Sequence, residues 1–370
     1  MDFNFSEDQQ QLRDAVRRWV DKAYTFEHRR AASKQGFSRT TWNELAELGL
    51  TALTVPEAHS GMGLGAVDAM VVMEELGRGI VLEPLAQAYI SAAVLSQYAP
   101  PEVQSQWLPQ IASGEALVVL AQQERRARYR LDRCEAQASK TGTGYSVSGQ
   151  KGIVPAGDQA DAFLVPAQLD GQQALFLVQR NASGVTTEGY GTQDGGRAAE
   201  LTLANSPATL ITTEGLAALE LAVDVGSACL CAESVGAMEQ ALRITAEYLN
   251  QRKQFGVFIG SFQALRHRVA DMKMQLELAR SMSYYATLHV NAPATERRAA
   301  IARARVQLGQ SMRFVGQNAV QLHGGIGVTD EYIISHYFKK LSQMEMTYGD
   351  TLHHLGEVSS RMQDTAGVSA

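Results

Sequence analysis

The segment "TYGDTLHHL" near the C-terminal end places one carboxylate beside two imidazoles. Asp350 is followed by Thr351 and by the pair His353 and His354. A carboxylate in such a segment can take a proton as a general base if water is excluded around it. Asp350 can instead cap a helix that begins at Thr351, because Asp is a favoured N-cap residue. The residue types leave both roles open.

A second cluster lies in "NQRKQFGVFIGSFQALRHRVADM", where one helical pattern ends at Arg252 and the next begins near Phe262. An Arg beside an aromatic residue at such a junction can bind a phosphate through two hydrogen bonds, while Phe255 packs on a ring. A solvated Arg252 and a core Phe255 would explain the same pattern. The cluster alone favours the latter.

A third cluster, "VQLHGGIGVTDEY", contains Gly324, Gly325 and Gly327. Glycines let the backbone approach a ligand closely and free its amide groups for an anion. A helix C-cap needs only one glycine, so this turn is a candidate binding segment. By contrast, "GMGLGA" at 61–66 matches a dinucleotide fingerprint only as a string, since helical patterns lie on both sides of it and the fingerprint needs a strand. An inter-helix loop explains it better.

The elements that must position these clusters change type twice along the chain. Ser6 and Gln9 predict a capping box, and helical periods follow at 41–50, 67–78 and 84–96. Short apolar runs with Gly and Asp-Gly turns, among them "ALVVLAQQ", "ADAFLVPAQL" and "QALFLVQR", predict a small antiparallel barrel or sandwich. Long helices at 216–251, 262–289 and 295–322 then predict an antiparallel bundle. We expect an α+β multidomain protein with a helical domain over 1–115, a β-barrel domain over 116–215 and a helical bundle over 216–370.

Composition excludes several classes of protein. The chain has 370 residues, a net charge of −6 and no basic run, so we expect no nucleic-acid partner. Three cysteines, too few for a disulfide framework or a zinc site, fit a reducing compartment. Acidic residues interrupt the most apolar helix, and the first ten residues do not resemble a signal peptide. We expect a cytoplasmic protein without a membrane span or metal.

Over nearly its whole length the chain resembles the acyl-CoA dehydrogenase flavoprotein family. The segments that carry the resemblance are "LGLTALTVPEAHSGMGLGAVDAMVVMEELGR", "WLPQIASGE", "RKQFGVFIGSFQALRHRVADM" and "QLHGGIGVTDEY". The segments "QERRARY", "TQDGGRAAELTL" and "HYFKKL" are similar to those of the branch described as pimeloyl-CoA dehydrogenase small subunits. The resemblance implies a helical domain, a β-barrel and a C-terminal four-helix bundle. It also implies an FAD-binding tetramer that oxidises an acyl-CoA thioester and reduces an electron-transfer flavoprotein.

The resemblance also implies cofactor-binding residues, by their match to family motifs. Arg252, Phe255 and Gln263 match the pyrophosphate side of the FAD site. Gln321, Gly324 and Gly325 match the glycine turn that receives the adenine end from a neighbouring subunit. Thr351 and His353 match a Thr-x-Gln motif, with His in place of Gln, and Gln123 with Glu124 matches a Thr-Glu motif above the flavin ring.

The chain departs from the family at the positions of the catalytic base. The family carries its catalytic Glu at one of two positions, and this chain has Gly349 at one and Lys253 at the other. Asp350 is the nearest replacement, with a side chain one methylene shorter and one residue later. The alternatives are a subunit without a base, whose larger partner carries it, and a flavin oxidase or monooxygenase on the same fold. A dicarboxylyl-CoA is the acyl substrate that the branch suggests.

Two further departures lie in the β domain. Glycines that commonly follow the Thr-Glu motif are replaced by "QERRARYRL", whose Arg125, Arg126, Arg128 and Arg130 could supply charge for the CoA phosphates or form a solvated face. In "KGIVPAG", Ile153 and Pro155 stand where the family commonly has aromatic residues that shield the flavin.

Overall fold

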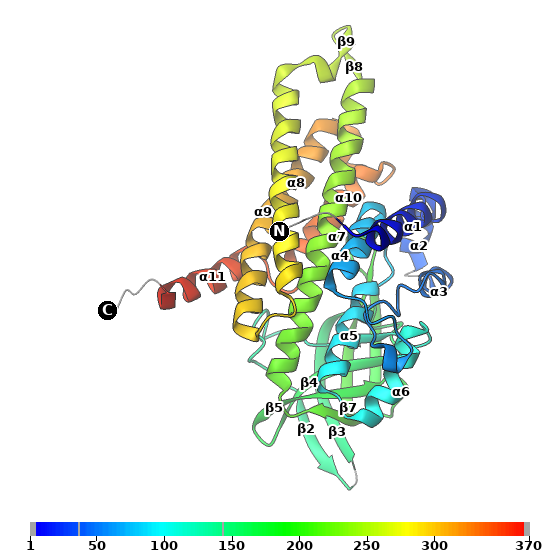
Figure 1. The fold of residues 1–370 in the computed structure, drawn as a ribbon, viewed down its shortest axis with the longest axis vertical. Coiled ribbons are helices and arrows are strands. Elements are labelled where there is room, and N and C mark those ends of the chain that lie inside the picture. Colours follow the sequence, from blue (N-terminus) through cyan, green and yellow to red (C-terminus); the bar gives the residue numbers. More distant parts are fainter. Residues whose placement is uncertain (1–4, 36–37, 143, 366–370) are drawn as a thin grey trace. The chain divides into compact units, whose positions relative to one another are not determined.

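The computed structural model describes residues 5–35, 38–142 and 144–365. The chain divides into two compact units. We name them the helical unit (Met1–Arg30, Met70–Val81 and Ser227–Ala370) and the barrel unit (Ala31–Ala69 and Leu82–Gly226). The expected order of helices, strands and helices is confirmed, as Figure 1 shows. The two units divide the chain differently from the three expected spans, because the first helix and most of the fourth group with the C-terminal helices.

The barrel unit is built on one sheet that closes on itself. Its order is β1-β4-β2-β3-β7-β5, and β5 also pairs with β4. β6 lies off this path and pairs with β7. Closure leaves few free edges, which protects a sheet against pairing with other chains. The strands are β1 (Val118–Leu120), β2 (Gln137–Thr141), β3 (Gly144–Pro155), β4 (Ala162–Leu169), β5 (Gln172–Gln179), β6 (Val185–Gly191) and β7 (Arg197–Thr212).

The barrel departs from the expected strands in two ways. β2 and β6 have no apolar run that predicts them, because both are polar and mostly exposed. In addition, the pairings of β1 and β2 with β4 are parallel, so the barrel is mixed rather than antiparallel. A parallel pair needs a long connection, and the β2–β3 hairpin lies within the one between β1 and β4.

Helices pack beside the sheet within the barrel unit. Trp42 of α3 (Arg39–Glu47) is buried and donates its indole N–H to the carbonyl of Gly114, at 2.9 Å. Ser91 of α5 (Leu85–Tyr98) donates to the carbonyl of Val118 in β1, at 2.7 Å. α6 (Pro101–Ala112) and the one-turn helix η1 (Glu57–His59) complete this group. "GMGLGA" lies between η1 and α4 (Ala66–Gly79), and no strand adjoins it within residues 48–84.

The helical unit contains the long helices of the chain. They are α1 (Glu7–Ala23), most of α7 (Gly215–Gln251), α8 (Gln263–His289), α9 (Ala294–His323), α10 (Ile333–Met346) and α11 (Thr351–Thr365); α2 (Phe26–Gln35) straddles the division. The predicted capping box of Ser6 and Gln9 begins α1. α4 and α7 cross where Gly77 and Gly236 lie, since a Cβ on either would come within 2 Å of a carbonyl oxygen of the other helix. By length and composition α7 could span a membrane, but 72% of its apolar window is buried, as in a core helix.

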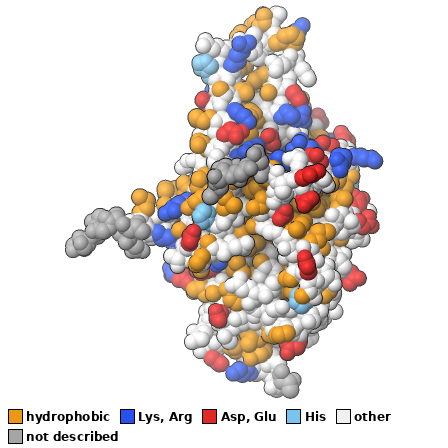
Figure 2. All heavy atoms as spheres, in the orientation of Figure 1, with side chains coloured by type: hydrophobic (Ala, Val, Ile, Leu, Met, Phe, Trp, Pro, Cys, Tyr) orange, Lys and Arg blue, Asp and Glu red, His pale blue; other side chains and the backbone are white. Residues whose placement is uncertain are grey.

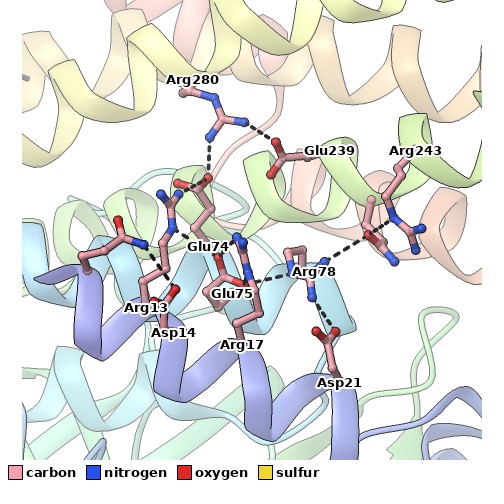
Figure 3. Close-up of polar contacts among 12 residues, drawn as sticks. Arg13, Asp14, Arg17, Asp21, Glu74, Glu75, Arg78, Glu239, Arg243 and Arg280 are labelled. Atoms are coloured by element: carbon pink, nitrogen blue, oxygen red, sulfur yellow. Dashed lines mark hydrogen bonds and ion pairs between the residues drawn. The ribbon is translucent and has the colours of Figure 1, made fainter. Parts of the chain in front are cut away.

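A network of ion pairs ties α1 to the long helices, as Figure 3 shows. The buried Glu75 accepts hydrogen bonds from Arg13, Arg17 and Arg78. Its neighbour Glu74 accepts from Arg13 and Arg280. Buried charges are tolerated only when they are paired in this way, so the network fixes the position of α1 within the helical unit.

Candidate active site

The connection between α7 and α8 is a two-residue hairpin that displays an aromatic ring. β8 (Lys253–Gln254) pairs with β9 (Val257–Phe258), and Phe255 and Gly256 form the turn with φ of 54° and 80°. Two positive φ values are typical of a type I′ turn, which glycine and asparagine adopt at less cost than phenylalanine. Phe255 is also 90% exposed. A strained, exposed aromatic side chain contributes little to its own fold, which supports a role in binding.

The predicted binding residues around this hairpin are accessible. Arg252 and Gln263 are exposed, and Arg252 makes no ion pair with the described residues. Lys253, at one of the two positions for a base, lies 4.6 Å from the ring centre of Phe258. Hydrophobic side chains gather at this end of the helical unit, where β8 and β9 lie (Figure 2).

The glycine turn lies close to the end of α7. Tyr248, one helical turn before Arg252, stacks on His323 with ring centres 4.4 Å apart, and its hydroxyl donates to the His323 carbonyl at 3.3 Å. Gly324 follows with φ of 64°, and a Cβ on Gly324 or Gly325 would meet open space. Gln321 is exposed one turn earlier. The helical unit therefore brings the Arg252 and Gly324 clusters together, with their ligand-facing groups accessible.

Asp350 caps a helix. Its Oδ1 accepts a hydrogen bond from the backbone N–H of His353 at 2.8 Å, which is the geometry of an N-cap on α11. Thr351, the first residue of α11, donates its hydroxyl to Glu345 at 2.5 Å, and its N–H binds the same carboxylate oxygen at 3.0 Å. The Asp350 side chain is thus engaged by the backbone of its own helix.

A buried arginine fixes the loop that carries Asp350. Arg305 of α9 donates through Nη2 to the carbonyl oxygens of Met344, Glu345, Thr347 and Gly349, at 3.1, 3.2, 2.7 and 2.9 Å. The first two belong to the last turn of α10, whose carbonyls lack partners within the helix. One guanidinium thus caps α10 and closes the turn into α11, so a shift of this loop would break several hydrogen bonds at once.

Gly349 leaves no room for a side chain. Its φ is 124°, which favours glycine, and a Cβ there would lie 2.5 Å from His353 Cδ2 and 2.8 Å from His354 Nε2. Burial lowers the pKa of His354 to about 2, and the nearby Arg305 guanidinium contributes. His354 is therefore neutral at physiological pH, and its Nε2 lies 3.4 Å from Arg305 Nε. Two imidazoles fill the space beside the position where a catalytic Glu is expected.

In the barrel unit, Gln123 directly precedes a residue that forms a buried ion pair. Lys151 donates to Glu124 at 2.5 Å, and both side chains are buried. Burial raises the pKa of the Glu124 carboxyl, but Lys151 and two backbone N–H groups outweigh burial and hold it below the ordinary value. The Gln123 carbonyl accepts from Gly152 at 2.9 Å, and Ile153 follows with φ of 51° and an exposed side chain. A β-branched residue at positive φ is strained, which singles out this bulge of β3.

The residues present fit an FAD cofactor. Arg252 supplies an exposed guanidinium for a pyrophosphate, Phe255 an exposed ring, and Gly324 and Gly325 a backbone with open space beside it among the described residues. Asp350 and Thr351 are not part of that group. From Arg305, which holds their loop, to His323 is about 27 Å along α9, at 1.5 Å per residue. Sequence reasoning missed Arg305, although an Arg within the apolar stripe of Ile301, Ala304 and Leu308 is a recognisable signal.

Comparisons with known proteins agree with this arrangement. Residues 6–115 match the model of the acyl-CoA dehydrogenase N-terminal domain, and residues 213–362 match that of the acyl-CoA dehydrogenase C-terminal domain. The acyl-CoA dehydrogenase IpdE2 of Mycolicibacterium smegmatis is 32% identical over 90% of this chain and 92% of its own length. The acyl-CoA dehydrogenase FadE27 of Mycobacterium tuberculosis is 29% identical over 99% of this chain and all of its own.

Solved structures are equally similar. A variant of the Tcur3481–Tcur3483 steroid ACAD superposes with a TM-score of 0.90 at 30% identity, covering 97% of this chain and 99% of the other. One chain of the ChsE4–ChsE5 complex of Mycobacterium tuberculosis superposes with a TM-score of 0.90 at 29% identity, covering 100% of this chain and 100% of the other. The chain belongs to the acyl-CoA dehydrogenase family, whose members are FAD-dependent oxidoreductases acting on CH–CH bonds.

Proposed function

We propose that this chain is a subunit of a heteromeric acyl-CoA dehydrogenase in which a partner chain supplies the catalytic carboxylate. The observation that carries the proposal is the loop before α11. Its Asp350 caps a helix, its backbone is held by Arg305, and its Gly349 has no space for a side chain. The resemblance to the small-subunit branch supports the same role. So do the names Tcur3481–Tcur3483 and ChsE4–ChsE5, each of which joins two different chains.

In this proposal the chain contributes to binding the cofactor rather than to proton transfer. Arg252 would bind the pyrophosphate of FAD, Phe255 would pack on the cofactor, and Gln263 would lie beside them. Gln321, Gly324 and Gly325 would approach the adenine end. Gln123, Thr351 and His353 stay predicted cofactor-binding residues, and Thr351 lies apart from the Arg252 and Gly324 clusters. The flavin, when bound, accepts the β-hydride of the acyl group. The α-proton goes to the partner's carboxylate.

We expect the acyl group to be a dicarboxylyl chain such as pimeloyl, as the motif wording suggests. The steroid ACAD among the similar structures suggests a bulky acyl group, derived from a steroid, as the alternative substrate. We expect electrons to pass to an electron-transfer flavoprotein, the assembly to be a tetramer and its location to be the cytoplasm. The domain spans 1–115, 116–215 and 216–370 stay part of this proposal.

An anaerobic titration tests the proposal. The purified chain, alone and together with any subunit that copurifies, is titrated with acyl-CoA thioesters that include pimeloyl-CoA and a steroid side-chain thioester, while the visible flavin band is followed. We expect bleaching only in the heteromer. The Asp350→Asn heteromer should bleach at the wild-type rate, because Asn preserves the cap and the base lies elsewhere.

A second candidate function is catalysis by the chain alone, with Asp350 as the base. Gly349 favours it, because the conformational freedom of a glycine before Asp350 could bring the carboxylate to a substrate. Bleaching of the chain alone that is lost in Asp350→Asn would establish that candidate and contradict the heteromer. Rapid reoxidation of the reduced flavin by air would instead indicate an oxidase or monooxygenase. A chain that purifies without FAD and bleaches only with its partner would agree with our proposal.

A further inference from the structure

The glycine turn, η3 (Gly324–Val328), follows a buried imidazole whose second ring nitrogen the fold does not use. His323 ends α9 and is 3% exposed. Its Nδ1 lies 2.8 Å from the carbonyl oxygen of Ala319, and because a carbonyl oxygen only accepts, the hydrogen of the neutral ring lies on Nδ1. Nε2 is therefore an acceptor. It is buried and has no hydrogen-bond partner among the described residues.

Two tyrosines and the turn itself enclose the ring of His323. Tyr248 of α7 stacks on it with ring centres 4.4 Å apart and planes inclined by 29°, and Tyr332, directly before α10, lies 5.2 Å away. Gly327 of the turn is buried, and a Cβ on it would lie 3.0 Å from the Cβ of His323. The imidazole therefore joins the glycine turn to α7 and to the start of α10.

The surroundings of the ring do not favour its charged form. The titratable side chains that face it are the phenols of Tyr248 and Tyr332. Burial raises the pKa of the Tyr332 phenol and lowers the pKa of the His323 imidazole, which the Ala319 carbonyl offsets only in part. The acids beside the two tyrosines are paired or exposed: Glu247 pairs with Arg243, Asp330 pairs with Lys339, and Glu331 is exposed. A charged imidazole here would be buried without a carboxylate partner among the described residues.

The fold alone does not require a nitrogen at Nε2. A phenyl ring would fill the same space and stack on the tyrosines, and it would leave no acceptor unsatisfied. A histidine differs from a phenylalanine here because it can take up a proton close to physiological pH. The imidazolium has a second N–H donor, and in the closed cluster that donor would have no acceptor among the described residues.

We infer that His323 is a positioning residue for the cofactor: its neutral ring holds the glycine turn against Tyr248 and Tyr332, and a proton on Nε2 releases the turn. The inference rests on the proposed function, in which this turn approaches the adenine end of FAD. Once the turn opens, the ring titrates near its ordinary pKa of about 6.5, whereas the closed turn resists protonation. FAD is therefore held most tightly above about pH 6.5, and its retention is lost as pH falls.

The release of FAD from the chain as isolated, with any copurifying subunit, tests the inference at pH 7.5 and pH 5.5. The fluorescence of the released flavin measures the rate. We expect the wild type to release FAD about tenfold faster at pH 5.5, because the share of the open turn rises by about that factor one unit below 6.5. His323→Phe should release FAD at the wild-type rate at pH 7.5 and no faster at pH 5.5. His323→Asn, which does not titrate either, should also lose the pH effect, but from a faster rate at pH 7.5 because the stacked ring is gone.

His289 provides a matched control. It ends α8 as His323 ends α9, and its Nδ1 lies 2.8 Å from the carbonyl oxygen of Tyr285, four residues earlier, whose ring centre is 4.3 Å from its own. It lies at the opposite end of α8 from the hairpin of β8 and β9, so His289→Phe removes a similar imidazole away from the glycine turn. This variant should keep the wild-type rates at both pH values.

Hydrogen exchange of residues 324–328 provides a readout that needs no bound flavin. Relative to the intrinsic rate at each pH, exchange should rise between pH 7.5 and pH 5.5 in the wild type and stay level in His323→Phe. If the chain purifies without FAD, exchange with and without added FAD replaces the release rate. Added FAD should then protect the turn of the wild type better at pH 7.5 than at pH 5.5, and that of His323→Phe equally at both.

Equal release rates of the wild type at the two pH values, or the same acceleration in His323→Phe, would overturn the inference. So would a turn that opens in acid while FAD stays bound, because the turn would then not hold the cofactor. Bleaching of the flavin by thioesters is a separate result. Bleaching confined to the heteromer, with an acid-insensitive flavin, leaves the proposed function intact and rejects the inference. Acid release that His323→Phe abolishes, in a heteromer that no thioester bleaches, does the reverse.

Discussion

Gly349 is the residue on which the assignment of chemistry depends. We predict that Gly349→Ala destabilises the chain by about 1–3 kcal/mol, because the substitution combines a strained φ with overpacking against two histidines. Gly356→Ala is a matched control in α11, where a Cβ meets open space, and should stabilise by up to about 1 kcal/mol through helix propensity. Urea unfolding of both variants tests whether the free energy of unfolding falls in Gly349→Ala and rises in Gly356→Ala. Gly349→Glu should not let the isolated chain bleach its flavin with thioesters.

His354 should make stability depend on pH. Its pKa is lowered to about 2 in the folded chain, whereas an unfolded histidine titrates near 6.5. The contribution of the neutral imidazole is therefore complete above about pH 6.5 and is lost as pH falls, by about 1.4 kcal/mol per unit. Urea titrations at pH 7 and pH 5 should show a smaller difference for His354→Gln than for the wild type. Equal differences in the two proteins would contradict this account.

Among the elements, α9 organises the candidate site through one side chain. We predict that Arg305→Leu costs about 3–5 kcal/mol, because it leaves buried carbonyls without a donor and replaces a buried cation. Arg305→Lys should recover part of that loss. Hydrogen exchange of residues 344–350 measures the effect directly and should rise most in the Leu variant. Arg303→Leu, exposed on the same helix, should leave exchange in this loop unchanged.

The elements also show what the sequence can and cannot predict. Long amphipathic or apolar helices such as α1 and α9 follow from periodicity, and the capping box of Ser6 fixes where α1 begins. β2 and β6 are invisible to the same reasoning, since polar strands acquire their structure from β3 and β7. The helix start at Thr351 was predictable from Asp350. The hold of Arg305 on the loop before it is a contact over forty residues, which no local pattern encodes.

For the whole molecule, we expect the exposed hairpin to contribute to binding the cofactor rather than to the stability of the fold. We predict that Phe255→Gly leaves the midpoint of thermal unfolding of the apo chain unchanged or slightly higher, because glycine suits a type I′ turn and the ring is 90% exposed. The same variant should retain at least tenfold less FAD after purification, on the order expected for a lost aromatic contact. Absorbance ratios of flavin to protein, with thermal scans, check both. A loss of thermal stability with normal flavin content would show that Phe255 serves the fold.

The two imidazoles that fill the space beside Gly349 also limit how a lineage carrying this chain can evolve. A Glu introduced at 349 alone meets His353 and His354, and a change of the histidines to smaller residues alone leaves a void and still no carboxylate. We expect either single change to lower the stability of the chain without restoring a base, so a catalytic Glu at 349 requires coordinated changes at three positions. If the proposed function holds, this chain therefore continues to depend on its partner for the base, and we expect the two chains to be inherited together.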